Sequence, residues 1–382
     1  MRLSSCSLIE DQLEREIKSL TSLRGLASIW VVLFHLVDTI DKIAGREHVA
    51  GLFDKGYLAV DFFFILSGFI LSKKYASLFM RKIDKQEYYS FLLKRVARIY
   101  PLYIAVIIFL IFYTLIVAGS FVGTAPPPAI ISHNFAIILA TNILMIQAWG
   151  IAYSLVVPAW SISTEWAAYL VFPALTKLWS ASSPSRVCLG AVCLLALLYV
   201  LTLLGPTGNL NLSYERSPFP LFRCFAGFSL GMLVARWTDI AASSLPALRD
   251  SHWAAAAAVV ILLYIFFPIN DAELVVAFPM LVLACVADRG WWCRALSWWP
   301  FYWLGEISYS IYLVHRPLLE VVEPLSSLVK NWVPAPVVAP LTEGVALLLV
   351  VGVAQVTYSV IERPGRRALQ RLSLRQTSPA AV

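Results

Sequence analysis

The stretch Arg24-Gly-Leu-Ala-Ser-Ile-Trp-Val-Val-Leu-Phe-His35 lies in the first apolar run that is long enough to cross a membrane. In a helix, the eleven steps from Arg24 to His35 correspond to a rise of about 16 Å. Arg24 is therefore expected at one membrane surface, and His35 is expected deep in the hydrocarbon region. An ionisable ring at that depth is costly and usually serves a function inside a helix bundle. The spacing predicts a membrane protein whose first span carries a functional histidine.

The composition of the whole chain agrees with this prediction. Of its 382 residues, 59% are hydrophobic and only 14% are charged, whereas soluble domains average about 25% charged residues. The net charge of +7 does not indicate nucleic-acid binding, because Lys and Arg fall in short loops beside apolar runs, as in other membrane proteins. The six cysteines show no disulfide or metal-ligand spacing, so no metal site is expected. The chain is predicted to be an all-α polytopic membrane protein.

Eleven apolar runs are long enough to be membrane spans, and they lie near 22–42, 57–73, 99–118, 130–149, 160–178, 187–204, 219–236, 253–268, 272–287, 303–323 and 337–360. An odd number of spans would put the termini on opposite sides, yet both termini carry basic residues typical of the cytoplasmic side. We therefore expect the run at 130–149 to be re-entrant or interfacial. This leaves about ten transmembrane helices plus that one segment.

The same charges divide the chain into three parts. Residues 1–21 are expected to form a cytoplasmic N-terminal segment, 22–362 a membrane domain, and 363–382 a basic cytoplasmic tail.

Four ionisable residues are expected at similar depth, in the central to outer part of the bilayer: His35, Asp61, Glu165 and His315. A carboxylate beside an imidazole can fix its tautomer and raise its basicity. His35 is thus a candidate general base or nucleophile, with Asp61 and Glu165 as further catalytic candidates. The alternatives are structural: a histidine that hydrogen-bonds between helices, acids in structural ion pairs, and a His315 that merely ends a kinked helix.

Three arginines are expected together at the cytoplasmic side. Arg95 and Arg98 are three residues apart, so they share one face of a helix, and Arg24 is expected at the same membrane surface. Converging guanidinium groups would hold a phosphate-rich ligand. Acyl-coenzyme A has a suitable shape, because its long arm could reach from these arginines to His35. The alternative is that Arg95 and Arg98 only anchor the topology.

Several motifs follow one another in order along the chain: Leu23-Arg-Gly-Leu-Ala27 with His35, Gly56-Tyr57 with Val60 to Phe69, Arg95 to Tyr103, Trp160-Ser-Ile-Ser-Thr-Glu165-Trp166, Arg223 to Gly231, and Leu304 to Pro317. Together they resemble the acyltransferase-3 family, the integral membrane acyltransferases that modify bacterial surface and secreted sugars. The resemblance extends over nearly the whole chain. Some family members carry an extracytoplasmic esterase-like domain after the membrane part, and this chain is expected to resemble the members that stand alone.

The resemblance implies an O-acyltransferase that moves an acyl group, usually acetyl, from cytoplasmic acyl-CoA to a hydroxyl of a saccharide or lipid-linked glycan. It implies acetyl-CoA as co-substrate with no bound cofactor, a multi-pass location in the bacterial cytoplasmic (inner) membrane, and both termini in the cytoplasm. Arg24, Arg95 and Arg98 would bind the donor. His35 would act either as a base or as a transiently acylated relay. The family motifs add candidate substrate-pocket residues: Trp160, Ser163, Tyr309 and His315.

Two other functions are compatible with the residues alone. A proton-coupled saccharide transporter or exporter would also place Asp, Glu and His inside the membrane. However, a transporter has no evident use for the three cytoplasmic arginines. The second of these functions is that of a structural subunit of a polysaccharide complex.

Overall fold

The structure is a computed structural model that describes residues 17–44, 52–120, 134–205, 208–212, 217–244, 250–266, 270–286, 290–329 and 335–377. In these ranges the regular structure is entirely helical. The helices are α2 (Lys18–Ala44), η1 (Leu52–Leu58), α3 (Ala59–Phe79), α4 (Lys85–Ser120), α6 (Phe135–Ile143), η2 (Val157–Ala159), α7 (Trp160–Trp179), α8 (Pro184–Leu204), α9 (Phe219–Ser244), α10 (Asp250–Phe266), α11 (Asp271–Val275), α12 (Ala277–Cys285), α13 (Trp291–Leu296), α14 (Trp299–Glu306), α15 (Ser308–Val329), α16 (Ala335–Thr357), η3 (Tyr358–Glu362) and α17 (Arg363–Thr377).

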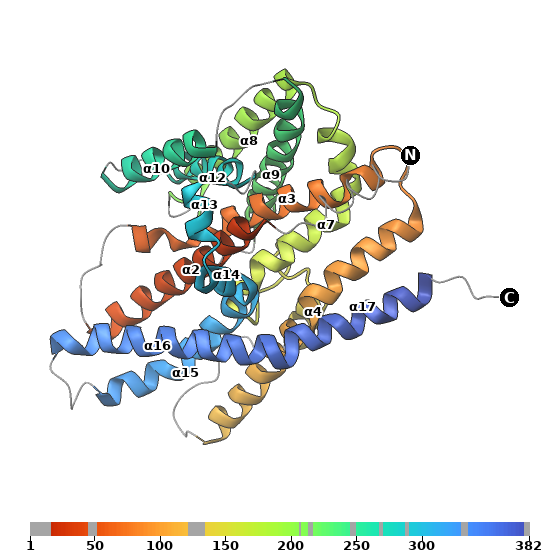
Figure 1. Cartoon of the computed structure of the whole chain (residues 1–382). Coiled ribbons are helices and arrows are strands. Elements are labelled where there is room, and N and C mark those ends of the chain that lie inside the picture. The colour runs from red at the N-terminus through yellow and green to blue at the C-terminus, as the bar shows by residue number, and fades with distance from the viewer. Residues whose placement is uncertain are drawn as a thin grey trace.

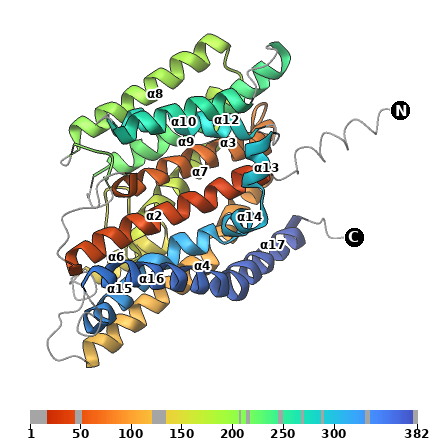
Figure 2. The ribbon, with the colours of Figure 1, turned by 60° about the vertical axis from the view of Figure 1, so that its left-hand side comes forward.

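Helices from distant parts of the chain form a bundle in which α2, α3 and α7 occupy the middle (Figure 1). On one side of these three helices lie α8, α9, α10 and α12, and on the other side lie α4, α15, α16 and α17. The second view gives the same order (Figure 2). The site residues predicted on α2, α3 and α7 are therefore carried by the middle of the bundle.

The outer helices expose apolar side chains, as helices that face lipid do. Phe112 of α4, Leu189 of α8 and Leu348 of α16 are each more than 60% exposed. In the described ranges, six helical segments are long and apolar enough to cross a bilayer: Lys18–Leu36, Phe53–Phe79, Lys85–Ile116, Pro184–Leu204, Phe219–Ala241 and Leu341–Arg371. The prediction of a helical membrane protein is confirmed, and the number of ten spans stays a prediction.

In the described part of the segment that was expected to be re-entrant, residues 134–149, the regular structure is the short helix α6. The nine residues of α6 rise about 14 Å, less than half of the hydrocarbon thickness of about 30 Å. After α6 the chain turns back, with Met145 at a φ of 55°. The Asn142 side chain holds this turn by donating to the carbonyl of Tyr153 and accepting from the amide of Leu155, both at 2.9 Å. Such non-helical backbone fits a membrane protein only where it is buried in protein.

Helices α3 and α9 pack with almost no space between their backbones. A Cβ added to Gly68 would lie 1.9 Å from the carbonyl oxygen of Phe228, and one added to Gly231 would lie 1.9 Å from that of Ile65. Only glycine permits this approach, which small residues typically provide in membrane helix pairs. The contact brings the start of α3 beside the start of α9, where an ion pair described below is formed.

The basic C-terminal residues continue the last long helix. The π-helical turn η3 joins α16 to α17, so the backbone stays helical from Ala335 to Thr377. Helix α17 approaches α4 closely enough that a Cβ on Gly365 would lie 2.5 Å from Cβ of Pro101. Within 363–377, the predicted tail is thus a helix packed on α4, while the domain boundary at 363 stays a prediction.

Candidate functional site

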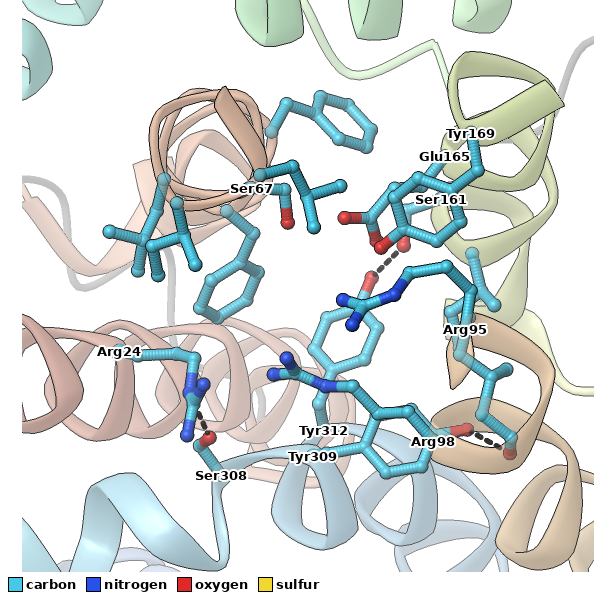
Figure 3. Close-up of a pocket in the computed structure, with 17 residues that line it drawn as sticks. Arg24, Ser67, Arg95, Arg98, Ser161, Glu165, Tyr169, Ser308, Tyr309 and Tyr312 are labelled. Carbon is cyan, nitrogen blue, oxygen red and sulfur yellow. Dashed lines mark hydrogen bonds between the residues drawn. The ribbon is translucent and has the colours of Figure 1, made fainter. Parts of the chain in front are cut away.

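A pocket lies between α2, α3, α4, α7 and α15 (Figure 3). Its space outside the protein atoms, open solvent included, is about 850 Å³. Its wall is mostly apolar on α3 and mostly polar on the other helices. The lining residues are Arg24, Phe63, Phe64, Leu66, Ser67, Ile70, Leu71, Arg95, Arg98, Ile99, Ser161, Ile162, Glu165, Tyr169, Ser308, Tyr309 and Tyr312.

The three arginines predicted to lie together all line this pocket. Arg24 is fixed by two hydrogen bonds, from Nε to the Ser308 hydroxyl at 2.9 Å and from Nη2 to the Gly305 carbonyl at 2.8 Å. These bonds are possible because α2 and α14 touch at glycine: a Cβ on Gly25 would lie 2.5 Å from the backbone nitrogen of Gly305. The backbone contact therefore sets the position of this guanidinium.

Arg95 and Arg98 reach the pocket from one face of α4, as their spacing predicted. The guanidinium of Arg95 lies 5.4 Å from the ring centre of Tyr75, and its Nη2 donates to the Tyr75 hydroxyl at 3.3 Å. Its Nε is buried and has no hydrogen-bond partner among the described residues. In Figure 3 the guanidinium groups of Arg95 and Arg98 point into the same space. The arrangement can hold an anionic group that would supply the missing acceptor.

Glu165 lines the same pocket from α7. Its charge acts on Arg95, and its buried Oε1 has no hydrogen-bond partner in the part of the chain that the structure describes. Sequence reasoning had grouped Glu165 with His35 at one depth. The structure places Glu165 with the arginines. This part of the pocket therefore presents both anion-binding guanidinium groups and a carboxylate whose buried Oε1 has no hydrogen-bond partner among the described residues.

Asp61 forms a buried ion pair, the structural alternative considered for the acids, with a partner that the sequence did not identify. Arg223 of α9 donates from Nε and Nη2 to the two carboxylate oxygens of Asp61, at 3.0 and 2.6 Å, and both side chains are fully buried. The other partner of Nη2 is the carbonyl of Tyr57, at 2.9 Å. Trp160 completes the unit, with its ring centre 5.3 Å from the guanidinium. Neither Asp61 nor Trp160 belongs to the pocket wall, and the arrangement is that of a structural link between α3, α7 and α9.

A buried arginine in an apolar span needs an acidic partner, so Arg223 could have been recognised as the partner of an acid in another span.

Ser163 also serves the scaffold. Its hydroxyl donates to the carbonyl of Met145 at 2.9 Å and accepts from the amide of Ala148 at 3.2 Å. The side chain is completely buried, and Ser163 is not part of the pocket wall. It ties α7 to the turn that follows α6, and its predicted role in substrate binding stays a prediction. Ser161, two residues earlier, is the serine of α7 that reaches the pocket.

His35 and His315 face each other, and neither is among the residues that line the pocket. Nε2 of His315 lies 3.3 Å from Nδ1 of His35, and the ring centres are 4.9 Å apart. His315 is fully buried, and its ring centre lies 6.0 Å from that of Tyr312, which lines the pocket. The two histidines therefore stand one side chain beyond the pocket wall. The unbroken helix α2 confirms the helical spacing between Arg24 and His35.

Tyr309 and Tyr312 belong to the pocket wall, and both hydroxyls are held by the backbone of other helices. Tyr309 donates to the carbonyl of Ile99 at 2.7 Å, and Tyr312 donates to that of Pro158 at 3.0 Å. The Tyr312 hydroxyl also lies 2.8 Å from the Ser161 hydroxyl. The motif around Tyr309 thus contributes to the pocket, as predicted.

Glu362 was not singled out from the sequence. This residue of η3 is 5% exposed, and it accepts a hydrogen bond of 2.6 Å from the Ser310 hydroxyl. Its carboxylate interacts electrostatically with Arg98, Arg24 and Arg366. An acid near the arginines will weaken their attraction for an anion. The signal that could have found it is the position of a single acid directly before a basic run.

Comparisons with known proteins agree on one family. The acyltransferase domain profile of the acyltransferase-3 family matches residues 17–358. Acyltransferase MdmB of Streptomyces mycarofaciens is 26% identical over 387 residues, covering 94% of this chain and 94% of the relative. O-acetyltransferase OatA of Staphylococcus aureus is 24% identical over 377 residues, covering 92% of this chain but 58% of the relative. No solved structure matches the chain significantly. The pocket therefore lies within the matched region, and the chain belongs to the acyltransferase-3 family and is an acyltransferase.

Proposed function

We propose that the protein moves an acetyl group from acetyl-CoA to a hydroxyl of a saccharide or glycoconjugate. The observation that carries the proposal is the pocket that Arg24, Arg95 and Arg98 line together. Another of its wall residues, Tyr312, lies with its ring centre 6.0 Å from that of His315 in the His35–His315 pair. The name of the relative OatA supports the choice of acetyl, and the family resemblance supports the saccharide acceptor. The location proposed is the bacterial inner membrane, with both termini in the cytoplasm.

The donor's phosphates bind to the three arginines in this proposal. Guanidinium groups form charge-assisted, often bidentate hydrogen bonds to phosphate, and the buried Nε of Arg95 gains the acceptor that it lacks. The thin arm of the donor then lies along the apolar wall of α3 and carries the thioester toward Tyr312. Ordering the reactive end in this way removes much of the entropic barrier to group transfer.

His35 is the proposed group that handles the proton or the acyl group. As a general base, it takes the proton of the acceptor hydroxyl while the oxygen attacks the thioester carbon. As a relay, it is acylated first and then passes the acyl group on. Tyr312 separates the ring pair from the pocket, so its side chain is expected to shift when the donor binds.

Glu165 is proposed to act at the arginine end of the pocket. Its Oε1 is buried without a hydrogen-bond partner among the described residues, so it is placed to accept a hydrogen bond from the donor or the acceptor. Asp61 is assigned to the scaffold because Arg223 engages both of its oxygens.

The test uses membranes that contain the full chain, incubated with acetyl-CoA labelled in the acetyl group. Labelled glycan is expected with the native chain and not with His35→Ala, provided that both chains insert to the same level. His252→Ala is the matched control, because His252 is an exposed histidine of α10 away from the pocket. Full transfer by His35→Ala would contradict the histidine role. Glycan export without any transfer of label would favour the transporter alternative.

A further inference from the structure

The proton positions in the His35–His315 pair are set by two backbone carbonyls. Nδ1 of His315 lies 2.7 Å from the carbonyl oxygen of Tyr312, and Nδ1 of His35 lies 3.0 Å from that of Val31. A carbonyl oxygen can only accept a hydrogen bond, so each Nδ1 carries a hydrogen. Neutral His315 then holds its lone pair on Nε2, the atom that lies 3.3 Å from Nδ1 of His35.

The same reasoning assigns the tautomer of His35. Its Nδ1–H has two acceptors within reach, the Val31 carbonyl and Nε2 of His315. A neutral imidazole carries one ring hydrogen, so the lone pair of His35 lies on Nε2. We propose that His315 is a positioning residue, which together with the Val31 carbonyl holds His35 as the Nδ1–H tautomer and so makes Nε2 of His35 the basic and nucleophilic nitrogen. This proposal rests on the proposed function of His35 and adds how its reactive nitrogen is selected.

The chemical step balances with this tautomer. Nε2 of His35 takes the proton of the acceptor hydroxyl as the oxygen bonds to the thioester carbon. The carbon–sulfur bond then breaks, and the leaving thiolate takes the proton back from Nε2. The products are the ester and free coenzyme A, and both rings return to their starting state. While Nε2 carries the proton, His35 is a cation, and its Nδ1–H bond to His315 becomes charge-assisted and stronger.

The burial of His315 suits this role. The ring is 0% exposed and its Nδ1 is committed to the Tyr312 carbonyl, so its Nε2 cannot turn away from His35 without losing that bond. Tyr312 itself lines the pocket. The backbone of one helical turn thus connects the pocket wall to the orientation of the reactive ring.

Three variants of His315 separate positioning from mere packing. In His315→Gln, the amide oxygen can reach the place of Nε2 and accept from His35. In His315→Asn, the shorter amide can donate to the Tyr312 carbonyl but does not reach His35, and His315→Leu does neither. We expect His315→Gln to keep most of the native kcat, and the other two to lose about tenfold or more, the factor given by one hydrogen bond of ~1.4 kcal/mol. KM for acetyl-CoA should change little in all three.

His252→Asn is the matched control and is expected to keep native kcat. Equal kcat in the Gln and Asn variants would overturn the proposal, and so would native kcat in His315→Leu.

A second readout follows the tautomer directly. The full chain, with ¹⁵N-labelled histidine and purified in lipid nanodiscs, is examined by NMR, and the His35 signals are assigned with His35→Ala. Protonated Nδ1 and unprotonated Nε2 are expected in the native chain, and a mixture of tautomers in His315→Asn. An unprotonated Nδ1 in the native chain would overturn the proposal. If instead His35→Ala still transfers acetyl, the proposed role of His35 fails, whatever the tautomer is.

Discussion

The buried pair of Asp61 and Arg223 allows a quantitative test of the scaffold role assigned to Asp61. Both side chains are fully buried and joined by two hydrogen bonds. Removing one partner of such a pair typically destabilises a protein by about 3–5 kcal/mol, because the other charge stays buried and unpaired. Asp61→Leu is therefore expected to lower the free energy of unfolding by that amount.

Arg223→Met should be the more severe change. Besides leaving the Asp61 carboxylate unpaired, it removes the donors to the carbonyls of Tyr57 and Leu210. Leaving buried acceptors unsatisfied adds about 1–3 kcal/mol, which brings the expected loss to about 4–8 kcal/mol. The double variant Asp61→Leu/Arg223→Met leaves no buried charge at the site of this pair. It should lose only about 1–3 kcal/mol, less than either single change.

The measurement is equilibrium unfolding of the purified chain in mixed micelles, monitored by tryptophan fluorescence. The free energies of unfolding of the native chain, the two single variants and the double variant are combined in a double-mutant cycle. The exposed pair of Lys73 and Asp239 is the matched control, because breaking a surface pair should change stability by about 1 kcal/mol or less. Acetyl transfer is assayed in parallel. A stable double variant that transfers no acetyl would refute the scaffold assignment and return Asp61 to the catalytic residues. A double variant less stable than both singles would refute the energetic reasoning.

Three further predictions concern the pocket and the helix contacts. Arg98→Lys should raise KM for acetyl-CoA about tenfold with little change in KM for the acceptor, since lysine keeps the charge but loses bidentate bonding; a defect confined to the acceptor in donor and acceptor titrations would contradict this. Glu362→Gln keeps the bond to Ser310 but removes a negative charge near the arginines, so KM for acetyl-CoA should fall roughly twofold to tenfold, and a rise would count against it. Gly231→Val should prevent stable folding, judged by detergent gel filtration, because its side chain would meet the Ile65 carbonyl at 1.9 Å. Gly352→Ala is the control, because no atom lies within 4 Å of the added carbon.

The parts of the site that could be predicted lie close together along single helices. The i, i+3 spacing puts Arg95 and Arg98 on one face of α4, and the eleven-residue spacing separates Arg24 from His35 along α2. The expectation that 130–149 is re-entrant or interfacial rested on the basic residues at both termini, which favour an even number of spans, and it stays a prediction.

The partners of these residues could not be predicted. The sequence indicates the depth of a residue in the membrane, but it does not indicate which helices lie side by side. Glu165, Asp61 and His35 were placed at one depth, yet the structure gives each a different neighbour. Asp61 meets Arg223 because α3 and α9 touch through Gly68 and Gly231. That contact depends on packing between segments 162 residues apart, which no local spacing reveals.

The relation between α2 and α15 explains how the two ends of the site are kept in register. Arg24 bonds to Ser308 at one end, and His35 meets His315 at the other. From the first contact to the second, the residue numbers increase on both helices. The two helices therefore run parallel, as expected if both cross the membrane outward. Between these contacts, Tyr309 and Tyr312 of α15 line the pocket. A shift of α15 along α2 would therefore change the arginine end and the histidine pair together. For this reason, donor binding at the arginines is expected to change the distance between His35 and His315.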